Sequence, residues 1–85
     1  MTYQITVLPV AAREIRKLPA DAKRRVQAVI ELLADDPRPP AARKLVARAE
    51  WRVRTGNYSV LYRIDDEVLI VVVAGAGHHR DIYRR

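Results

Sequence analysis

With 85 residues, of which 49% are hydrophobic, the chain is long enough for one small folded domain and too apolar for an intrinsically disordered protein. The absence of cysteine excludes a disulfide framework and a thiolate zinc cluster, and it is compatible with a reducing cytoplasm. Sixteen lysines and arginines against ten acidic residues give a formal net charge of +6, which favours a polyanionic partner.

The first half of the chain predicts a strand followed by a helical hairpin. Residues 3–7, YQITV, alternate apolar and polar side chains as a half-buried strand does. Pro9 ends this strand and suits the first turn of a helix over residues 10–18. A second helix is predicted over residues 20–34, because its apolar side chains recur at helical spacing and Asp21 stands near its N-terminus.

A β-hairpin is the main feature predicted for the middle of the chain. Residues 35–44, DDPRPPAARK, are rich in proline and show no periodicity, so they predict a loop within the domain. Residues 50–54 and 58–64 then alternate as two strands. Between them, Gly56 and Asn57 are residue types that readily take the positive φ of a hairpin turn.

The last strand is predicted over residues 68–74, VLIVVVA, which are apolar throughout, as in a central strand covered on both faces. Gly75 and Gly77 are expected to end it. This run is far shorter than the roughly 20 residues that span a bilayer, and no secretory signal is visible, so a soluble cytoplasmic protein is expected. The order β-α-α-β-β-β predicts a single α+β domain over residues 1–85: a helical hairpin packed on one face of a largely antiparallel four-stranded sheet.

Alternation along the hairpin divides its side chains between two faces of the sheet. The large apolar residues are predicted to point toward the helices: Trp51, Val53, Tyr58, Val60, Tyr62 and Ile64. Arg52, Arg54 and Ser59 then share the other face, which is expected to be uncovered. Guanidinium groups there suit phosphate, because their planar forks bind it bidentately.

The segment between Asp36 and Asp65 is strongly basic, and its only acidic residue is Glu50. Its basic residues are Arg38, Arg43, Lys44, Arg48, Arg52, Arg54 and Arg63. A solvated surface normally mixes both signs of charge, so we interpret this segment as a footprint for phosphates. A genome rich in G and C, which encodes many arginines, is the alternative explanation.

The chain ends in GHHRDIYRR, which admits three interpretations. A metal site is disfavoured, because His78 and His79 would point to opposite sides of an extended chain and cationic neighbours repel a divalent ion. A mobile polar tail is the second interpretation, but Ile82 and Tyr83 are residues that bury against a sheet. The third is the acid–base part of a site, since histidine titrates nearest to neutral pH. We expect the tail to fold over the uncovered face. This brings His78, His79, Arg80 and Tyr83 toward Arg52 and Arg54.

Three stretches, taken in order, resemble the RelE/ParE superfamily of bacterial toxins over nearly the whole chain. They are LPADAKRRVQAVIELLADDP, WRVRTGNYSVLYRIDDEVLIVVV and GHHRDIYRR. The most specific parts are the hairpin pattern G-x-Y-x-[VL]-x-Y-x-I-x-D and the terminal H-x-R-D-I-Y. The resemblance implies a RelE-like microbial RNase-type fold and the toxin of a type II toxin–antitoxin pair. Its partner would be a cognate antitoxin, with operator DNA bound only through the complex of the two.

For the RelE branch, the resemblance further implies an endoribonuclease that acts on the ribosome with its mRNA and inhibits translation. The mRNA is cut in the ribosomal A site without metal or cofactor, by attack of a 2′-hydroxyl on the adjacent phosphate. This chemistry requires a base, an acid and cations around the phosphate.

Residue by residue, the resemblance implies a catalytic group of Arg52, Arg54, His79, Arg80 and Tyr83. An imidazole, His79 or else His78, is expected to act as base or acid, because arginine stays protonated in proteins. Tyr83 is expected to orient or stack on the target nucleotide. Further contacts to RNA are expected from Arg43, Lys44, Arg48, Ser59 and His78.

Two positions depart from the family pattern, because Ser59 and His79 stand where the family has arginines. A missing charge at the phosphate predicts reduced cleavage, by about 10²–10³ if the loss resembles that of an oxyanion-hole donor. A toxin of the ParE branch, which inhibits DNA gyrase, is one alternative. A member that mainly binds its antitoxin and represses its operon is another. The basic pair in RVR, residues 52–54, favours the RelE branch.

Overall fold

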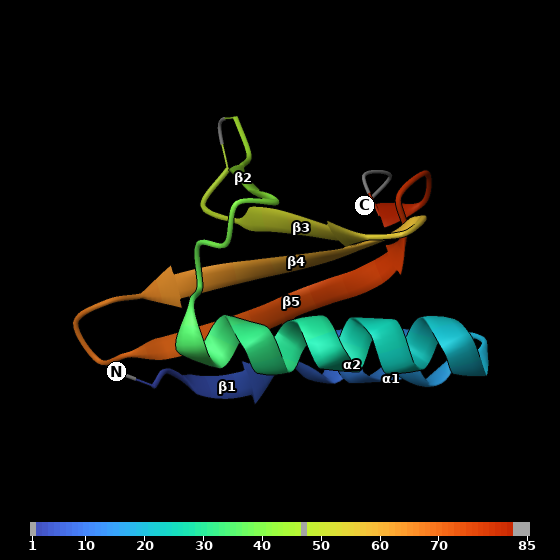
Figure 1. Cartoon of the computed structure of the whole chain (residues 1–85), viewed down its shortest axis with the longest axis horizontal. Coiled ribbons are helices and arrows are strands. Elements are labelled where there is room, and N and C mark those ends of the chain that lie inside the picture. Colours follow the sequence, from blue (N-terminus) through green and yellow to red (C-terminus); the bar gives the residue numbers. More distant parts are fainter. Residues whose placement is uncertain (1, 47, 83–85) are drawn as a thin grey trace.

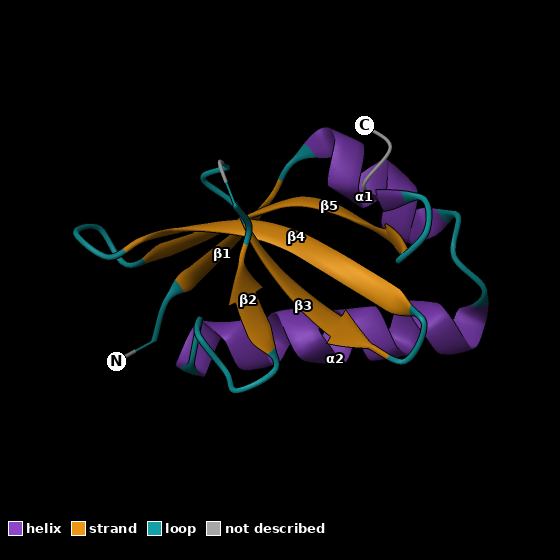
Figure 2. Ribbon diagram, turned by 90° about the horizontal axis from the view of Figure 1, so that it is seen from above, coloured by secondary structure: helices purple, strands orange, loops and turns teal. Residues whose placement is uncertain are grey.

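Two helices lie against one face of a twisted five-stranded sheet in the computed structural model, which describes residues 2–46 and 48–82 (Figures 1 and 2). In chain order the elements are β1 (Gln4–Val7), α1 (Pro9–Arg16), α2 (Ala20–Asp35), β2 (Ala42–Lys44), β3 (Trp51–Thr55), β4 (Tyr58–Asp65) and β5 (Ile70–His78). The strand order in the sheet is β1-β5-β4-β3-β2. β1 runs parallel to β5, and every other neighbouring pair is antiparallel. The predicted α+β class and helical hairpin are confirmed, with one strand more than expected.

Local sequence determines where the helices begin and end. Pro9 occupies the first turn of α1, where its missing N–H is not needed. Asp21 lies in the first turn of α2, where its charge is favourable. That helix ends at Asp35, because Asp36 precedes a proline and is extended, with φ −142° and ψ 97°. In the described part of the chain, neither helix combines the length and apolar character needed to cross a bilayer.

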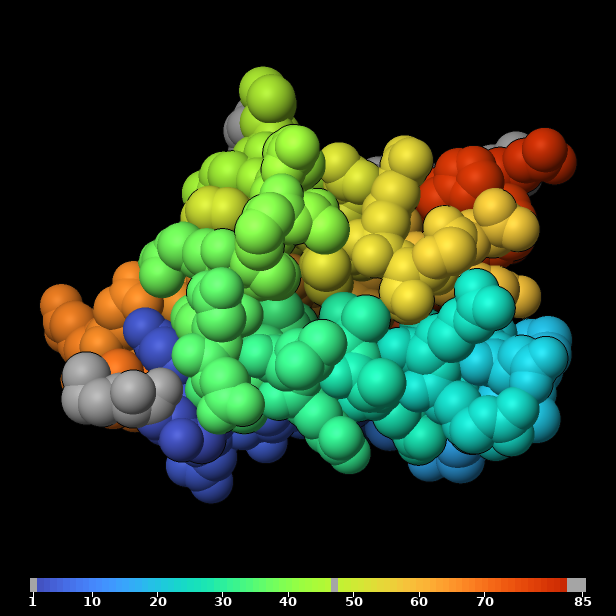
Figure 3. All heavy atoms as spheres, viewed as in Figure 1, coloured from blue at the N-terminus to red at the C-terminus, as the bar shows by residue number. Residues whose placement is uncertain are grey.

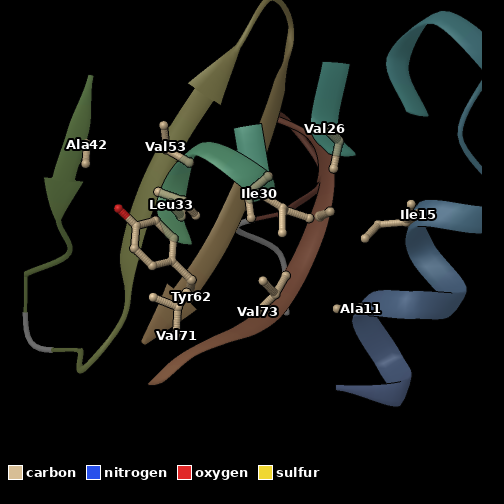
Figure 4. Close-up of a cluster of buried hydrophobic side chains, with 12 residues drawn as sticks. Ala11, Ile15, Val26, Ile30, Leu33, Ala42, Val53, Tyr62, Val71 and Val73 are labelled. Carbon is tan, nitrogen blue, oxygen red and sulfur yellow. The ribbon is translucent and has the colours of Figure 1, made fainter. Parts of the chain in front are cut away.

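The hydrophobic core lies between the helices and the sheet (Figure 4). The helices contribute Ala11, Ile15, Val26, Ile30 and Leu33, and the strands contribute Ala42, Val53, Val60, Tyr62, Val71, Val73 and Ala76. The face predicted to point at the helices is confirmed, because Trp51, Tyr58 and Ile64 also pack against this cluster. The Tyr62 hydroxyl donates to the Pro37 carbonyl at 2.7 Å, and burial raises the pKa of Tyr62 to about 12.

Three boundaries predicted from the sequence are wrong. The loop over residues 35–44 contains β2, which pairs with β3 and adds an edge strand. The last strand begins at Ile70, because Leu69 has a φ of 57° and belongs to the turn. That strand also continues through Gly75 and Gly77, which pair with Leu61 and Ser59. Pairing with β4 holds β5 extended, so the glycines do not end it.

A register shift in β4 and β5 accompanies these glycines. Leu61 pairs with Gly75, whereas Tyr62 pairs with Val73, so one residue of β5 is left over as a bulge. Beyond it, the Ala76 N–H donates to a Glu14 carboxylate oxygen at 3.2 Å. Helix α1 therefore supplies an acceptor for β5 immediately after the irregularity.

Arg38, counted in the basic segment, serves to join three parts of the fold. Its guanidinium donates to both oxygens of Asp66, at 3.1 and 2.8 Å, and lies over the Trp51 ring at 5.4 Å. The Tyr3 hydroxyl donates to the same carboxylate at 2.6 Å. The hydrogen bonds from Arg38 and then Tyr3 lower the pKa of Asp66 to about 2. Arg38 is therefore a structural residue rather than a free phosphate ligand.

Candidate functional site

Cross-strand pairing defines the residues of the face opposite the helices, which we call the open face. In antiparallel strands, directly paired residues lie on the same side of the sheet. Arg52 pairs with Arg43 on one side and with Leu61 on the other, and Arg54 pairs with Ser59. The open face therefore includes Gln4, Thr6, Arg43, Arg52, Arg54, Ser59, Leu61, Arg63, Asp65, Ile70, Val72, Gly75 and Gly77. The predicted position of Arg52 and Arg54 away from the helices is confirmed.

These two arginines are the unengaged cations of the open face within the described residues. Arg54 is exposed and Arg52 is half-buried, and neither forms a hydrogen bond or ion pair with another described residue. Arg43, by contrast, donates to the carbonyls of Pro40 and Ala42, at 2.7 and 2.8 Å. Free guanidinium groups on a face without helices are suited to binding a phosphate.

Glu50 engages two further arginines of the basic segment. Its carboxylate accepts from Arg48 at 2.9 Å and from Arg63 at 3.1 Å, and its side chain is only 12% exposed. Lys44 donates to the Arg48 carbonyl at 2.8 Å. The phosphate footprint inferred from the sequence is thus partly an internal ion-pair network, which the count of charges did not reveal.

The two histidines lie at the end of β5, beside the turn between β3 and β4. His78 pairs with Tyr58, and the two rings meet edge to face at 5.7 Å. The rings of His78 and His79 are stacked, with centroids 4.5 Å apart. The expectation that they point to opposite sides is wrong, because the strand ends at His78 and the chain turns there. No group of three or more side chains suited to metal binding occurs among the described residues.

Hydrogen bonds distinguish the two imidazoles chemically. The backbone N–H of His79 donates to the Asn57 carbonyl at 2.9 Å, and its ring Nδ1 lies 3.0 Å from the same oxygen. A carbonyl oxygen only accepts, so His79 Nδ1 carries a proton and its Nε2 has a lone pair in the neutral ring. His78 differs, because its Nδ1 already accepts the Arg80 backbone N–H at 3.2 Å. Of the two rings, His79 is therefore the better candidate for a base.

The tail turns back over the open face beyond the end of β5, on the side away from the helices (Figure 1). Ile82 is only 2% exposed, and its Cδ1 would lie 4.0 Å from a Cβ built on Gly77. The space-filling view shows the tail in red beside the yellow β3–β4 hairpin (Figure 3). The predicted burial of Ile82 is confirmed, whereas Tyr83 lies outside the described residues.

Ser59 is on the open face but is fully buried, so the expectation that it is uncovered is wrong. Its direct partner across the strands is Gly77, over which Ile82 of the tail lies. The Ser59 Oγ has no hydrogen-bond partner among the described residues. The row Arg54–Ser59–Gly77 and the tail thus meet at one end of the sheet. Among the described residues, no hydrogen bond joins His78 or His79 to Arg52 or Arg54, and Arg80 is exposed.

A hollow on the surface lies at the other end of the open face. Its lining includes Arg63, Val72 and three consecutive acidic residues, Asp65, Asp66 and Glu67. Carboxylates at its rim repel phosphate, so this hollow is a poor site for a polyanion. The row formed by Arg54, Ser59 and Gly77, together with the neighbouring Arg52, remains the better candidate site.

Comparisons with known proteins agree with the fold and with these motifs. The model of the family described as ParE toxin of type II toxin–antitoxin system, parDE, matches residues 5–83. Toxin RelG of Mycobacterium tuberculosis is 38% identical to this chain over 90 residues, and the match covers all of both proteins.

Two solved structures illustrate the likeness in three dimensions. One chain of the toxin–antitoxin complex RelBE2 from Mycobacterium tuberculosis is 28% identical, with a TM-score of 0.84 over 95% of each chain. One chain of the archaeal RelE–RelB complex from Pyrococcus horikoshii OT3 shares the fold at 21% identity, with a TM-score of 0.82 over 95% of this chain and 99% of that one. The chain belongs to the ParE toxin family, within the RelE/ParE superfamily of toxins from type II toxin–antitoxin systems.

Proposed function

We propose that this toxin is a RelE-like, ribosome-dependent mRNA endonuclease that binds the sugar–phosphate backbone on its open face and inhibits translation in the cytoplasm. The observation that carries this proposal is the pair of unengaged guanidinium groups of Arg52 and Arg54 opposite the helices. A stretch of backbone carrying two adjacent phosphates matches such a pair in charge. The similarity to RelG and to the RelE structures supports the same activity.

The proposed reaction needs no metal. The 2′-oxygen of one nucleotide forms a bond to the adjacent phosphorus, and the bond from phosphorus to the 5′-oxygen breaks. The products are a 2′,3′-cyclic phosphate and a free 5′-hydroxyl, whose proton comes from a water molecule. The 2′-hydroxyl proton goes to a base, for which His79 Nε2 is suited because Asn57 fixes the ring through Nδ1.

The remaining site residues have supporting roles in this proposal. Arg52, Arg54 and Arg80 stabilise the negative charge that develops on the phosphate. Tyr83 orients the target nucleotide. Contacts farther along the RNA would come from a second group once its members leave their internal partners or cover: Arg43, Lys44, Arg48, Ser59 and His78.

The proposed partner that keeps the toxin inactive is a cognate antitoxin. The relatives from M. tuberculosis and P. horikoshii are structures of complexes with an antitoxin or with RelB. An antitoxin with acidic groups would neutralise Arg52 and Arg54, and the charge of +6 would speed the encounter. Operator DNA would then be bound only by the complex.

Primer extension on an mRNA during translation tests the proposal. Cuts at codon positions that appear only with ribosomes present are expected, and Arg52→Ala with Arg54→Ala should abolish them. The match to the ParE toxin family favours a second candidate, inhibition of DNA gyrase. Gyrase-dependent DNA breaks without mRNA cuts would establish that alternative, and neither product would leave antitoxin binding and operon repression.

The role of His79 has its own measurement. His79→Ala is expected to lower the cleavage rate and to remove its dependence on pH between 6 and 8. His78→Ala is the matched control, because the His78 Nδ1 is already an acceptor. Equal pH profiles for the parent and His79→Ala would exclude this residue as base or acid.

A further inference from the structure

The two edges of the sheet differ in how they are protected. β1 and β2 are the outer strands, so each leaves one side without a neighbouring strand. β2 carries Arg43 and Lys44 and follows Pro39 and Pro40, and charged residues and prolines discourage an edge from pairing with another chain. β1 contains neither a charged side chain nor a proline. It lies at the margin of the molecule, where its outer side is open to a further strand (Figure 1).

Free backbone groups line the outer side of β1. The N–H groups of Gln4 and Leu8 both donate to β5, at 2.8 and 3.0 Å. Alternate residues of a strand direct their backbone groups to the same neighbour, so those of Ile5 and Val7 point away from β5. In the described part of the chain, neither Ile5 nor Val7 gives these groups to another partner. Each of the two residues therefore offers one donor and one acceptor to an added strand.

The charge around this edge indicates what kind of strand fits it. No charged side chain occurs between residues 2 and 12, although 31% of the chain is charged. Val7 is 38% exposed and borders a groove between α1 and α2, whose lining also includes Ile15. The two charged residues of that lining, Arg16 and Glu31, have opposite signs. The edge and the groove are thus neutral overall, so they suit a neutral strand rather than a polyanion.

We propose that the occupant of this edge is β1 of a second copy of the chain, paired antiparallel about a two-fold axis at Thr6. In this register Ile5 of each copy lies opposite Val7 of the other, and the two residues exchange both of their N–H···O bonds. The outward groups of both residues are then satisfied in each copy. Directly paired residues share one side of a sheet, so Ile5 of the second copy also covers the exposed part of Val7. The strand is its own complement, as a two-fold interface requires.

Area and charge both make this self-association weak. A single strand pair buries less than the roughly 800 Å² on each partner that a stable interface of standard size has. Each copy carries a formal charge of +6, so two copies repel each other at low salt. Salt screens this repulsion, so self-association should strengthen as salt rises, whereas RNA binding should weaken. β1 contributes no residue to the proposed RNA site, so this interface does not depend on the proposed function.

The absence of cysteine allows a direct test of the register by disulfide cross-linking. Across the proposed axis, Thr6 faces Thr6 of the second copy in a non-hydrogen-bonded pair, with Cα atoms about 4.5 Å apart and within reach of a disulfide. Gln4 lies on the same side of the strand, but its Cα would be about 14 Å from its counterpart, at about 3.4 Å per residue. Under mild oxidation Thr6→Cys should form covalent dimers much faster than Gln4→Cys, the matched control. Equal rates for the two variants would refute the register.

Sedimentation velocity without cross-linking tests the interface itself. The average mass of the parent should rise with protein concentration from micromolar to near-millimolar and, at fixed concentration, with KCl. Val7→Lys replaces a covered valine by a charge at the pairing edge and should weaken self-association by about tenfold or more. Val68→Lys is the matched control, because it adds the same charge at a valine that is 60% exposed between β4 and β5. It should associate nearly as strongly as the parent.

Other outcomes would contradict the pairing. A parent that remains monomeric at every concentration and salt would refute it and would leave the β1 edge to a strand of a different protein. Equal association of Val7→Lys and Val68→Lys would assign the interface to another surface. Association that weakens as KCl rises would show that charge, and not the neutral edge, joins the copies. Circular dichroism verifies the fold of each variant, and if Val7→Lys does not fold, the comparison of Thr6→Cys with Gln4→Cys still decides.

Discussion

In the proposed function, Glu50 limits the number of phosphates that the open face binds, and its substitution gives a quantitative prediction. In Glu50→Gln, Arg48 and Arg63 lose the carboxylate that holds them at 2.9 and 3.1 Å. The number of guanidinium groups available to RNA then rises from three, Arg52, Arg54 and Arg80, to five. The substitution keeps the shape of the side chain and removes one negative charge.

The magnitude follows from counterion release. For a single strand, the slope of log affinity against log salt is about −0.7 for each phosphate that is neutralised. Three arginines give a slope of about −2.1, so the affinity of the parent should fall about 125-fold when KCl rises tenfold. Five arginines give about −3.5, or a fall of about 3,000-fold over the same range. Glu50→Gln should therefore bind more tightly at low salt and lose that advantage as salt rises.

The assay is fluorescence anisotropy with one labelled single-stranded RNA between 50 and 500 mM KCl, with circular dichroism to verify that each variant is folded. Asp21→Asn is the matched control, because it raises the net charge equally but releases Arg24 on α2, away from the open face. Its slope should equal that of the parent. If Glu50→Gln and the parent have the same slope, Arg48 and Arg63 do not reach the RNA and the reasoning is wrong.

Three further predictions concern stability. Burial raises the pKa of Tyr62 to about 12. The neutral Tyr62 hydroxyl therefore contributes fully to the free energy of unfolding below pH 10, and this contribution is lost as the pH rises toward 12. In urea unfolding, Tyr62→Phe should not lose stability over this alkaline range. The pKa of Asp66 is lowered to about 2. The ionised Asp66 therefore contributes to the free energy of unfolding above its usual pKa of 3.8, and this contribution is lost as the pH falls through 2. In Asp66→Asn, the free energy of unfolding should depend less on pH over this acidic range. Ser59→Ala removes a buried hydroxyl without a partner, so its unfolding free energy should equal or exceed that of the parent by up to about 1 kcal/mol, and a loss of 2 kcal/mol or more would contradict this.

The sequence predicted the layers of the fold well because its strong signals are periodic. Alternation along residues 50–64 correctly separated the core side chains from Arg52 and Arg54. β2 was missed because its three residues follow three prolines and carry no alternation that can be recognised. The extension of β5 through Gly75 and Gly77 was missed because pairing with β4 outweighs the weak strand propensity of glycine.

The candidate site was predictable in its location but not in its interactions. The positions of Arg52, Arg54 and the returning tail follow from strand alternation and from the apolar Ile82. The engagement of Arg48 and Arg63 by Glu50 depends on which side chains meet across β3 and β4, which a count of charges does not specify. The full burial of Ser59 was missed because alternation assigns a side chain to a face but does not specify what covers that face.

Net charge is therefore a poor measure of the RNA affinity that we propose for this toxin. Four basic residues of the segment between Asp36 and Asp65 are held by carboxylates or carbonyls, namely Arg43, Lys44, Arg48 and Arg63. A fifth, Arg38, is held by Asp66. Within the described part of this segment, Arg52 and Arg54 are the free guanidinium groups, so we expect the open face to bind RNA weakly on its own, since each phosphate contact contributes little at physiological salt. Weak intrinsic binding makes cleavage depend on a scaffold that presents the mRNA, which is consistent with the proposed requirement for the ribosome.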